Sequence, residues 1–71
     1  MRKRSPTLPS MHHPNTLVAI RDSVDFYDRM LLEYAPRTAF NLATVYLVRK
    51  SQVLDFKTSE RILRCALDAR S

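Results

Sequence analysis

The sequence contains no glycine in its 71 residues. Glycine is needed where a backbone turns tightly or approaches a ligand closely, as in phosphate-binding loops, dinucleotide-binding turns and the nucleophile elbow of hydrolases. The two histidines, His12 and His13, are adjacent and lack a nearby cysteine or carboxylate at metal-ligand spacing. We therefore predict a protein that is not an enzyme and that uses no cofactor, metal or small-molecule substrate.

Cysteine is nearly absent as well. The single Cys65 cannot form an internal disulfide, which excludes a disulfide-stapled secreted scaffold. No stretch approaches the roughly 18 apolar residues that span a bilayer, and the N-terminus lacks the apolar segment of a secretory signal. We therefore expect a cytoplasmic protein without a membrane contact. We expect the Cys65 side chain to act as a small buried or half-buried hydrophobic group.

What is present fits one small domain behind a basic arm. Hydrophobic residues make up 45% of the chain and charged residues 27%, which is typical of a globular domain. Three of the four prolines fall within residues 1–14, and proline fixes φ and removes a backbone donor. We predict a flexible basic arm over residues 1–14 and a single helical domain over residues 15–71, with Met11 as an alternative start.

The clearest pattern is an apolar stripe whose members are three and four residues apart, which is the period of a helix. It predicts a helix from about 16 to 35, with Asn15 and Thr16 as N-cap candidates. Pro36 should end the helix because its ring disfavours helical geometry at the preceding residue. The stripe comprises Leu17, Ile20, Val24, Tyr27, Leu31 and Tyr34.

A second apolar row, Ala19, Phe26 and Met30, lies beside the first on the same predicted helix, and Leu32 and Ala35 extend it. In one interpretation the two rows form a wide face that packs against the rest of the same chain. In the other, one row packs internally and the other meets a second subunit or a protein partner. The candidate interface residues are Ala19, Phe26, Tyr27, Met30, Leu31 and Tyr34.

Two further helices are predicted in the second half. Pro36 suits a first helical turn, and residues 39–48 are almost entirely apolar. Their β-branched content also fits a strand, but a lone strand would have no partner here. After a connector over residues 51–57, Thr58 or Ser59 can cap a third helix. The fold class is therefore all-α, as a small three-helix bundle or an open helical array with a basic N-terminal arm.

Positive charge is concentrated in the two ends of the sequence. Residues 1–21 hold four basic groups and no acidic ones. Residues 22–36 hold one basic and four acidic groups, and residues 37–71 hold seven basic and three acidic groups. A basic arm and a basic second half are suited to following a phosphate backbone. The candidate nucleic-acid contacts are Arg2, Lys3, Arg4, Arg49, Lys50, Lys57, Arg61 and Arg64.

Two classes of function remain open. The first is a non-enzymatic regulatory or adaptor protein that forms a helical homodimer and docks on a protein partner. The sequence favours it, because the first helix is acidic as well as apolar and an acidic surface repels nucleic acid. The alternative is a small transcription regulator that binds nucleic acid directly. A helix-turn-helix over residues 38–50 and 58–70 is only weakly indicated, because the connector is long and contains no glycine.

Overall fold

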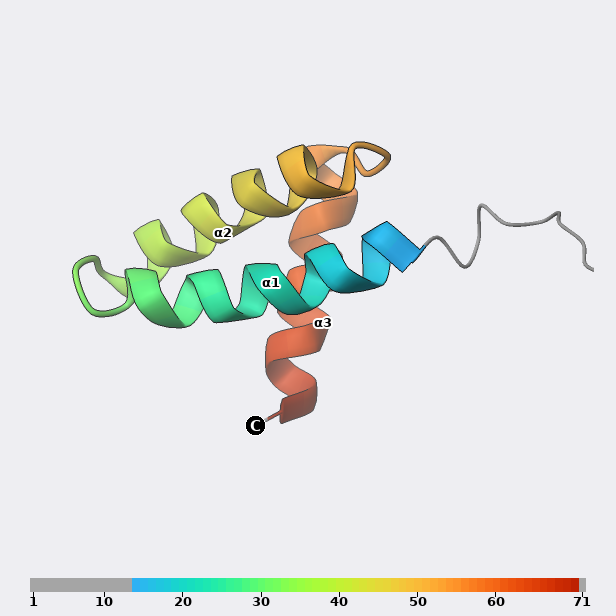
Figure 1. Cartoon of the computed structure of the whole chain (residues 1–71). Helices are drawn as coiled ribbons and strands as arrows, with labels where there is room; N and C mark the ends of the chain where they lie inside the picture. The colour runs from blue at the N-terminus through green and yellow to red at the C-terminus, as the bar shows by residue number, and fades with distance from the viewer. Residues whose placement is uncertain (1–13, 71) are drawn as a thin grey trace, which may run out of the picture.

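The computed structural model describes residues 14–70, with side chains from residue 16 onward, as three helices (Figure 1). α1 spans Pro14–Met30, α2 spans Pro36–Ser51 and α3 spans Phe56–Arg70. No strand occurs in these residues, so the all-α prediction is confirmed and the second segment is a helix. The predicted arm lies outside the described residues, apart from Pro14.

α1 and α2 form an antiparallel hairpin closed by residues 31–35 (Figure 1). The prediction that the first helix reaches residue 35 is wrong, because the chain leaves α1 in a turn in which the Tyr34 amide donates to the Met30 carbonyl at 2.8 Å. Ala35 is extended, with φ −63° and ψ 155°, as expected before proline. The predicted N-caps are also wrong, since α1 already begins at Pro14 and Asn15 and Thr16 lie inside it.

α3 crosses one side of the hairpin instead of running along it (Figure 1). Gln52 ends α2 in the left-handed region at φ 63°, and its amide donates to the Val48 carbonyl at 3.1 Å. The Asp55 carboxylate accepts a 2.8 Å hydrogen bond from the Thr58 amide and so caps α3. The predicted caps, Thr58 and Ser59, are therefore wrong, and the connector is shorter than predicted.

The core is built from small side chains where the three helices meet. Ala19, Ala43, Leu47 and Leu63 are fully buried and form its centre. Members of both apolar rows of α1 pack against this centre, as the interpretation of one wide internal face predicts. No helix within the described residues is long and apolar enough to cross a membrane. The residues of the two rows that pack there are Ile20, Val24, Phe26 and Tyr27.

Candidate functional site

The outer side of α3 carries a group of exposed cations. Lys57, Arg61 and Arg64 are four and three residues apart, which places them on one side of the helix. Arg37, in the first turn of α2, joins them, because it lines a surface cavity of about 410 Å³ together with Glu60 and Arg64. We call Arg37, Lys57, Arg61 and Arg64 the basic face. Within residues 14–70, none of these four side chains forms an ion pair with a carboxylate.

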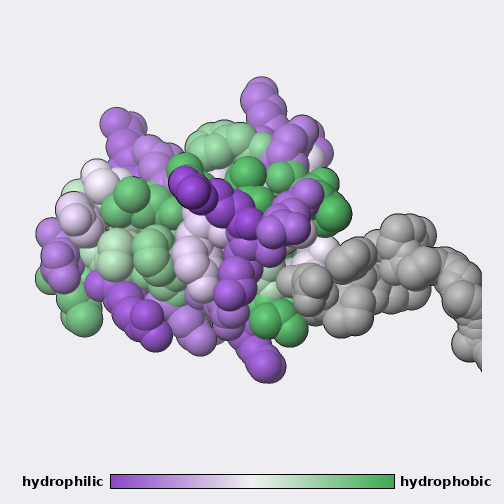
Figure 2. All heavy atoms as spheres, turned by 45° about the horizontal axis from the view of Figure 1, so that its top comes forward, coloured by the Kyte–Doolittle hydropathy of each residue, from purple (hydrophilic) through white to green (hydrophobic). Residues whose placement is uncertain are grey.

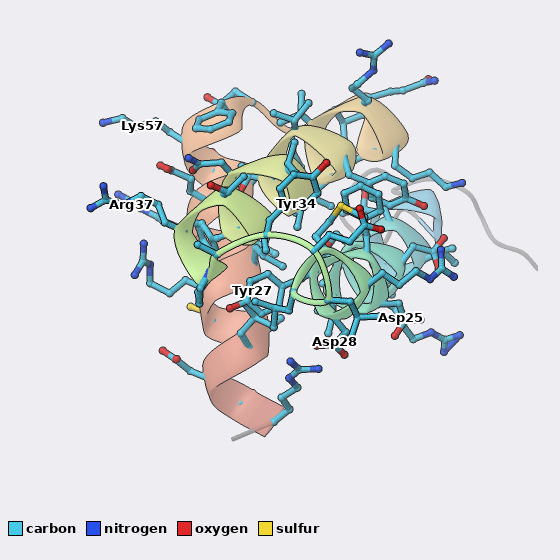
Figure 3. All side chains as sticks on the ribbon, turned by 90° about the vertical axis from the view of Figure 1, so that its left-hand side faces the viewer. Asp25, Tyr27, Asp28, Tyr34, Arg37 and Lys57 are labelled. Atoms are coloured by element: carbon cyan, nitrogen blue, oxygen red, sulfur yellow. The ribbon has the colours of Figure 1, made fainter. Side chains whose placement is uncertain are left out.

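The acidic residues of α1 lie away from the basic face. In Figure 3, Arg37 and Lys57 project to the left of the molecule, whereas Asp25 and Asp28 lie on α1 to the right of α3, where Asp28 pairs with Arg70 near the end of that helix. Glu60 is the acidic residue that shares the cavity beside Arg37. The repulsion expected between an acidic first helix and nucleic acid therefore falls on a different surface from the one that carries the cations.

Arg64 is held by an aromatic side chain of α2. Its guanidinium carbon lies 5.1 Å from the centroid of the Phe40 ring, within the range of a cation–π interaction. The Phe40 ring in turn meets Tyr27 of α1 edge to face, with centroids 6.5 Å apart and an interplanar angle of 83°. This chain of three side chains links all three helices and fixes the position of one cation of the basic face.

The connection between α2 and α3 meets the requirements of a helix-turn-helix better than the sequence suggests. Only Gln52–Asp55 separate the two helices, whereas the sequence predicts a connector over 51–57. A turn of about three or four residues is the usual length in this unit. The left-handed position that often holds glycine is taken by Gln52. Both objections to the unit, the length of the connector and the missing glycine, are therefore removed.

A groove opens between the end of the hairpin and the second half of α3. We call it the tip groove; its volume is about 420 Å³. At its edge Arg70 donates two hydrogen bonds to Asp28, at 2.7 and 2.8 Å. These bonds lower the pKa of Asp28 and raise that of Arg70. The groove is lined by Tyr27, Leu31, Phe40, Arg64, Leu67, Asp68 and Arg70.

Three of the six predicted interface residues lie on the hairpin side of α1. Ala19 is fully buried and has no surface to offer a partner, so its assignment to an interface is corrected. Phe26 stacks on Tyr46 of α2, with ring centroids 4.6 Å apart and planes 8° from parallel. Met30 is half-buried. Ala19 and Phe26 of the second apolar row therefore pack within their own chain, so little of this row is left for the predicted dimer.

The other three predicted interface residues gather near the end of the hairpin. Tyr27 and Leu31 line the tip groove, and Tyr34 is exposed in the connection to α2. Figure 3, which views the molecule from this end, shows Tyr27 and Tyr34 near its centre. The predicted interface set leaves out two residues of this end: Leu32, which only extends the second apolar row, and Phe40, whose contacts are between helices.

The predicted nucleic-acid contacts fall into three groups. Lys57, Arg61 and Arg64 come together on the basic face, which is completed by Arg37, a residue that no sequence pattern singles out. A second group is exposed at the end of α2, and the third lies outside the described residues. The second group is Arg49 and Lys50, and the third is Arg2, Lys3 and Arg4.

Cys65 is exposed, so the prediction of a buried or half-buried side chain is wrong. The period of α3 turns Leu63 into the core, and Cys65, two positions on, points away from it. Among the described residues no group of three or more His, Cys, Asp or Glu side chains could hold a metal ion. His12 and His13 lie outside those residues.

The sequence matches no protein-family model, and no curated protein or solved structure is significantly similar to it. The fold and the two surfaces described above are therefore interpreted from the chain's own residues. The basic face and the tip groove meet at Phe40 and Arg64, which line the cavities of both.

Proposed function

We propose that the protein is a non-enzymatic regulator that binds double-stranded nucleic acid through the exposed side of α3. The observation that carries the proposal is the basic face: three exposed cations on α3, the helix that follows a short turn, and Arg37 beside them on α2, none of which forms an ion pair within residues 14–70. The sequence-based preference for a protein partner rests on the acidity of the first helix. That acidity lies on another surface (Figure 3).

The charge of the α2–turn–α3 unit suits a phosphate backbone. Residues 37–70 hold seven basic and three acidic groups, a net charge of +4. Each phosphate that a lysine or arginine neutralises releases condensed counterions, and this release supplies most of the affinity of non-specific binding. The major groove of B-form DNA is wide enough to admit one α-helix. The steep crossing of α3 over the hairpin leaves its outer side open for such an approach (Figure 1).

The cations of the basic face have different roles in this proposal. Lys57 presents a point charge at the first turn of α3, suited to a phosphate. Arg61 and Arg64 present planar guanidinium groups that can donate two parallel hydrogen bonds to one acceptor pair. Because Arg64 rests on Phe40, less conformational freedom is lost when it binds. The sequence adds three further cations, Arg2, Lys3 and Arg4, outside the described residues, and a deletion of residues 1–10 tests whether they take part.

The test is fluorescence anisotropy with a labelled duplex, repeated over a series of salt concentrations. We expect Lys57→Gln with Arg61→Gln to weaken binding roughly tenfold at low salt and to reduce the slope of log K against log salt by about two. The matched control, Arg21→Gln with Arg29→Gln, removes the same charge from exposed positions of α1 and should leave affinity nearly unchanged.

Three outcomes would overturn the proposal. Equal losses in the two double variants would mean that net charge alone matters and that α3 is not the binding surface. A wild-type chain that leaves the duplex free at low salt would reject nucleic acid altogether. Capture of a protein that is insensitive to salt and to the α3 substitutions, with no duplex binding, would establish the adaptor function instead.

A further inference from the structure

The connection between α1 and α2 exposes apolar side chains without a role in the fold. Leu32 is 84% exposed, and its neighbours Leu31 and Tyr34 are also exposed. Connections on a protein surface are normally polar, since they face water. Hydrophobic atoms accordingly reach the surface at this end of the molecule (Figure 2). Three neighbouring exposed apolar side chains, rather than a single one, form a patch suited to a contact outside the chain.

The tip groove begins at the residue next to Leu32. Leu31 forms part of its lining, with the rings of Tyr27 and Phe40 and the side chain of Leu67. Leu32 itself does not line the groove of its own chain. A protruding leucine therefore lies beside a groove whose lining is partly apolar and partly charged, the charged residues being Arg64, Asp68 and Arg70.

We infer that the tip groove is occupied by Leu32 of a second copy of this chain, in a two-fold symmetric dimer. A two-fold interface is self-complementary, because residue i of one copy meets residue j of the other and the reverse contact forms as well. A protrusion and a groove side by side satisfy this condition, since each copy offers what the other lacks. The groove of each chain then covers the exposed leucine of its partner.

Charge favours a second copy over another apolar occupant. Glu33 follows Leu32 directly and is exposed, and within residues 14–70 it forms no ion pair. Arg64 lines the groove and is likewise without an ion pair among these residues, whereas the other lining arginine, Arg70, is paired with Asp28. Asp68 is the carboxylate in the lining, so the pairing requires Glu33 to approach the Arg64 side of the rim. Insertion of Leu32 into the groove brings Glu33 to the rim that carries Arg64 of the other copy, and two-fold symmetry forms this pair twice.

The dimer and the proposed nucleic-acid contact share Arg64, so the dimer is tested without nucleic acid. The full chain is examined by sedimentation velocity over a range of concentrations. We expect the wild-type chain to dimerise with a dissociation constant roughly in the micromolar range, because two leucines and two exposed ion pairs must offset the entropy of association. A chain that stays monomeric far above that range overturns the inference.

The matched substitutions are Leu32→Asp and Val53→Asp. Val53 is also highly exposed, at 61%, but lies in the connection at the opposite end of the hairpin (Figure 1). We expect Leu32→Asp to weaken the dimer at least tenfold and Val53→Asp to leave it unchanged, with circular dichroism showing both variants folded. Equal weakening by the two substitutions overturns the inference.

A charge exchange tests the occupant of the groove. Glu33→Arg and Arg64→Glu should each weaken the dimer, and the double variant should restore it, because the exchanged charges meet again across the two-fold axis. A double variant no stronger than the weaker single variant excludes the pairing of Glu33 with Arg64. A different protein bound in the groove of a monomeric chain would show that the occupant is not a second copy.

Discussion

Phe26 on α1 and Tyr46 on α2 stack almost face to face, with ring centroids 4.6 Å apart and planes 8° from parallel. The pair explains where the second apolar row of α1 goes: it holds the two arms of the hairpin together. Phe26 could anchor a protein partner only if its ring were free, but here the ring packs within the fold.

We expect Phe26→Ala to destabilise the protein by about 2–4 kcal/mol, since it removes a half-buried ring and its stacking partner's contact. Tyr46→Phe keeps the ring and should change the free energy of unfolding by less than about 0.5 kcal/mol. Urea denaturation followed by circular dichroism measures both. If Phe26→Ala leaves stability unchanged, the ring is free for a partner and the packing described above is wrong.

Two leucines provide a matched comparison of buried and exposed positions. Leu47 is fully buried at the centre of the core, whereas Leu32 is 84% exposed. Leu47→Ala should cost about 2–5 kcal/mol, which removes much or all of the stability of a chain of this size. Leu32→Ala, compared at concentrations below those at which the chain dimerises, should change stability by less than about 0.5 kcal/mol. Thermal melts of the two variants would contradict this if Leu32→Ala were the more damaging change.

Ser59 has a buried hydroxyl without a hydrogen-bond partner in the part of the chain that the structure describes. The buried hydroxyl of Ser23, by contrast, donates to the Ile20 carbonyl at 2.7 Å. Ser59→Ala should therefore stabilise the protein by about 1 kcal/mol, because it removes an unsatisfied group and alanine favours helix. Ser23→Ala should raise the stability less, because it also removes the hydrogen bond to Ile20. A destabilised Ser59→Ala variant would mean that the hydroxyl does have a partner.

The sequence predicts the helices well and their ends poorly, for a physical reason. The three-and-four spacing from Leu17 onward is set by local geometry and survives in the structure. Where α1 ends depends on the turn that brings α2 back, and that turn is fixed by tertiary packing. The cap of α3 was missed because Asp55 follows an apolar stretch, Val53 and Leu54, that looks like part of a longer connector.

The candidate site could be predicted only in part. Lys57, Arg61 and Arg64 share a helix, so their spacing alone places them on one side. Arg37 joins them across the boundary between two helices, which no local pattern records. The separation of the basic face from Asp25 and Asp28 likewise depends on how the helices pack, and a count of charges along the sequence does not contain it.

Acid should destabilise the protein through two carboxylates. Hydrogen bonds from Arg70 hold the pKa of Asp28 below its ordinary value of 3.8, and bonds from Thr58 lower that of Asp55. A carboxylate whose pKa is lowered by folding contributes stability above its ordinary pKa and loses it as pH falls through the lowered value. We therefore expect a constant urea midpoint from neutral pH to about pH 5 and a decline below about pH 4.

In the double variant Asp28→Asn with Asp55→Asn, the urea midpoint should fall less between pH 5 and acid pH than it does in the wild-type chain. Its midpoint at neutral pH should be lower than that of the wild-type chain, because both groups lose their charge at every pH. High salt should reduce the contribution of the exposed Asp28–Arg70 pair. If the urea midpoint of the double variant falls as much in acid as that of the wild-type chain, other groups are responsible for the pH dependence.

The last prediction concerns the arm and the end of α2 in nucleic-acid binding. Deleting residues 1–10 removes Arg2, Lys3 and Arg4 but leaves all three helices, since α1 begins at Pro14. If these three cations contact phosphates, the slope of log K against log salt should fall by up to about 2.7, while the circular dichroism signal of the helices is kept. Arg49→Gln with Lys50→Gln, at the exposed end of α2, should reduce the slope by up to about 1.8 if that end also reaches the backbone. A deletion that leaves both affinity and slope unchanged would exclude the arm from the contact and leave the cations of α2 and α3 to supply it.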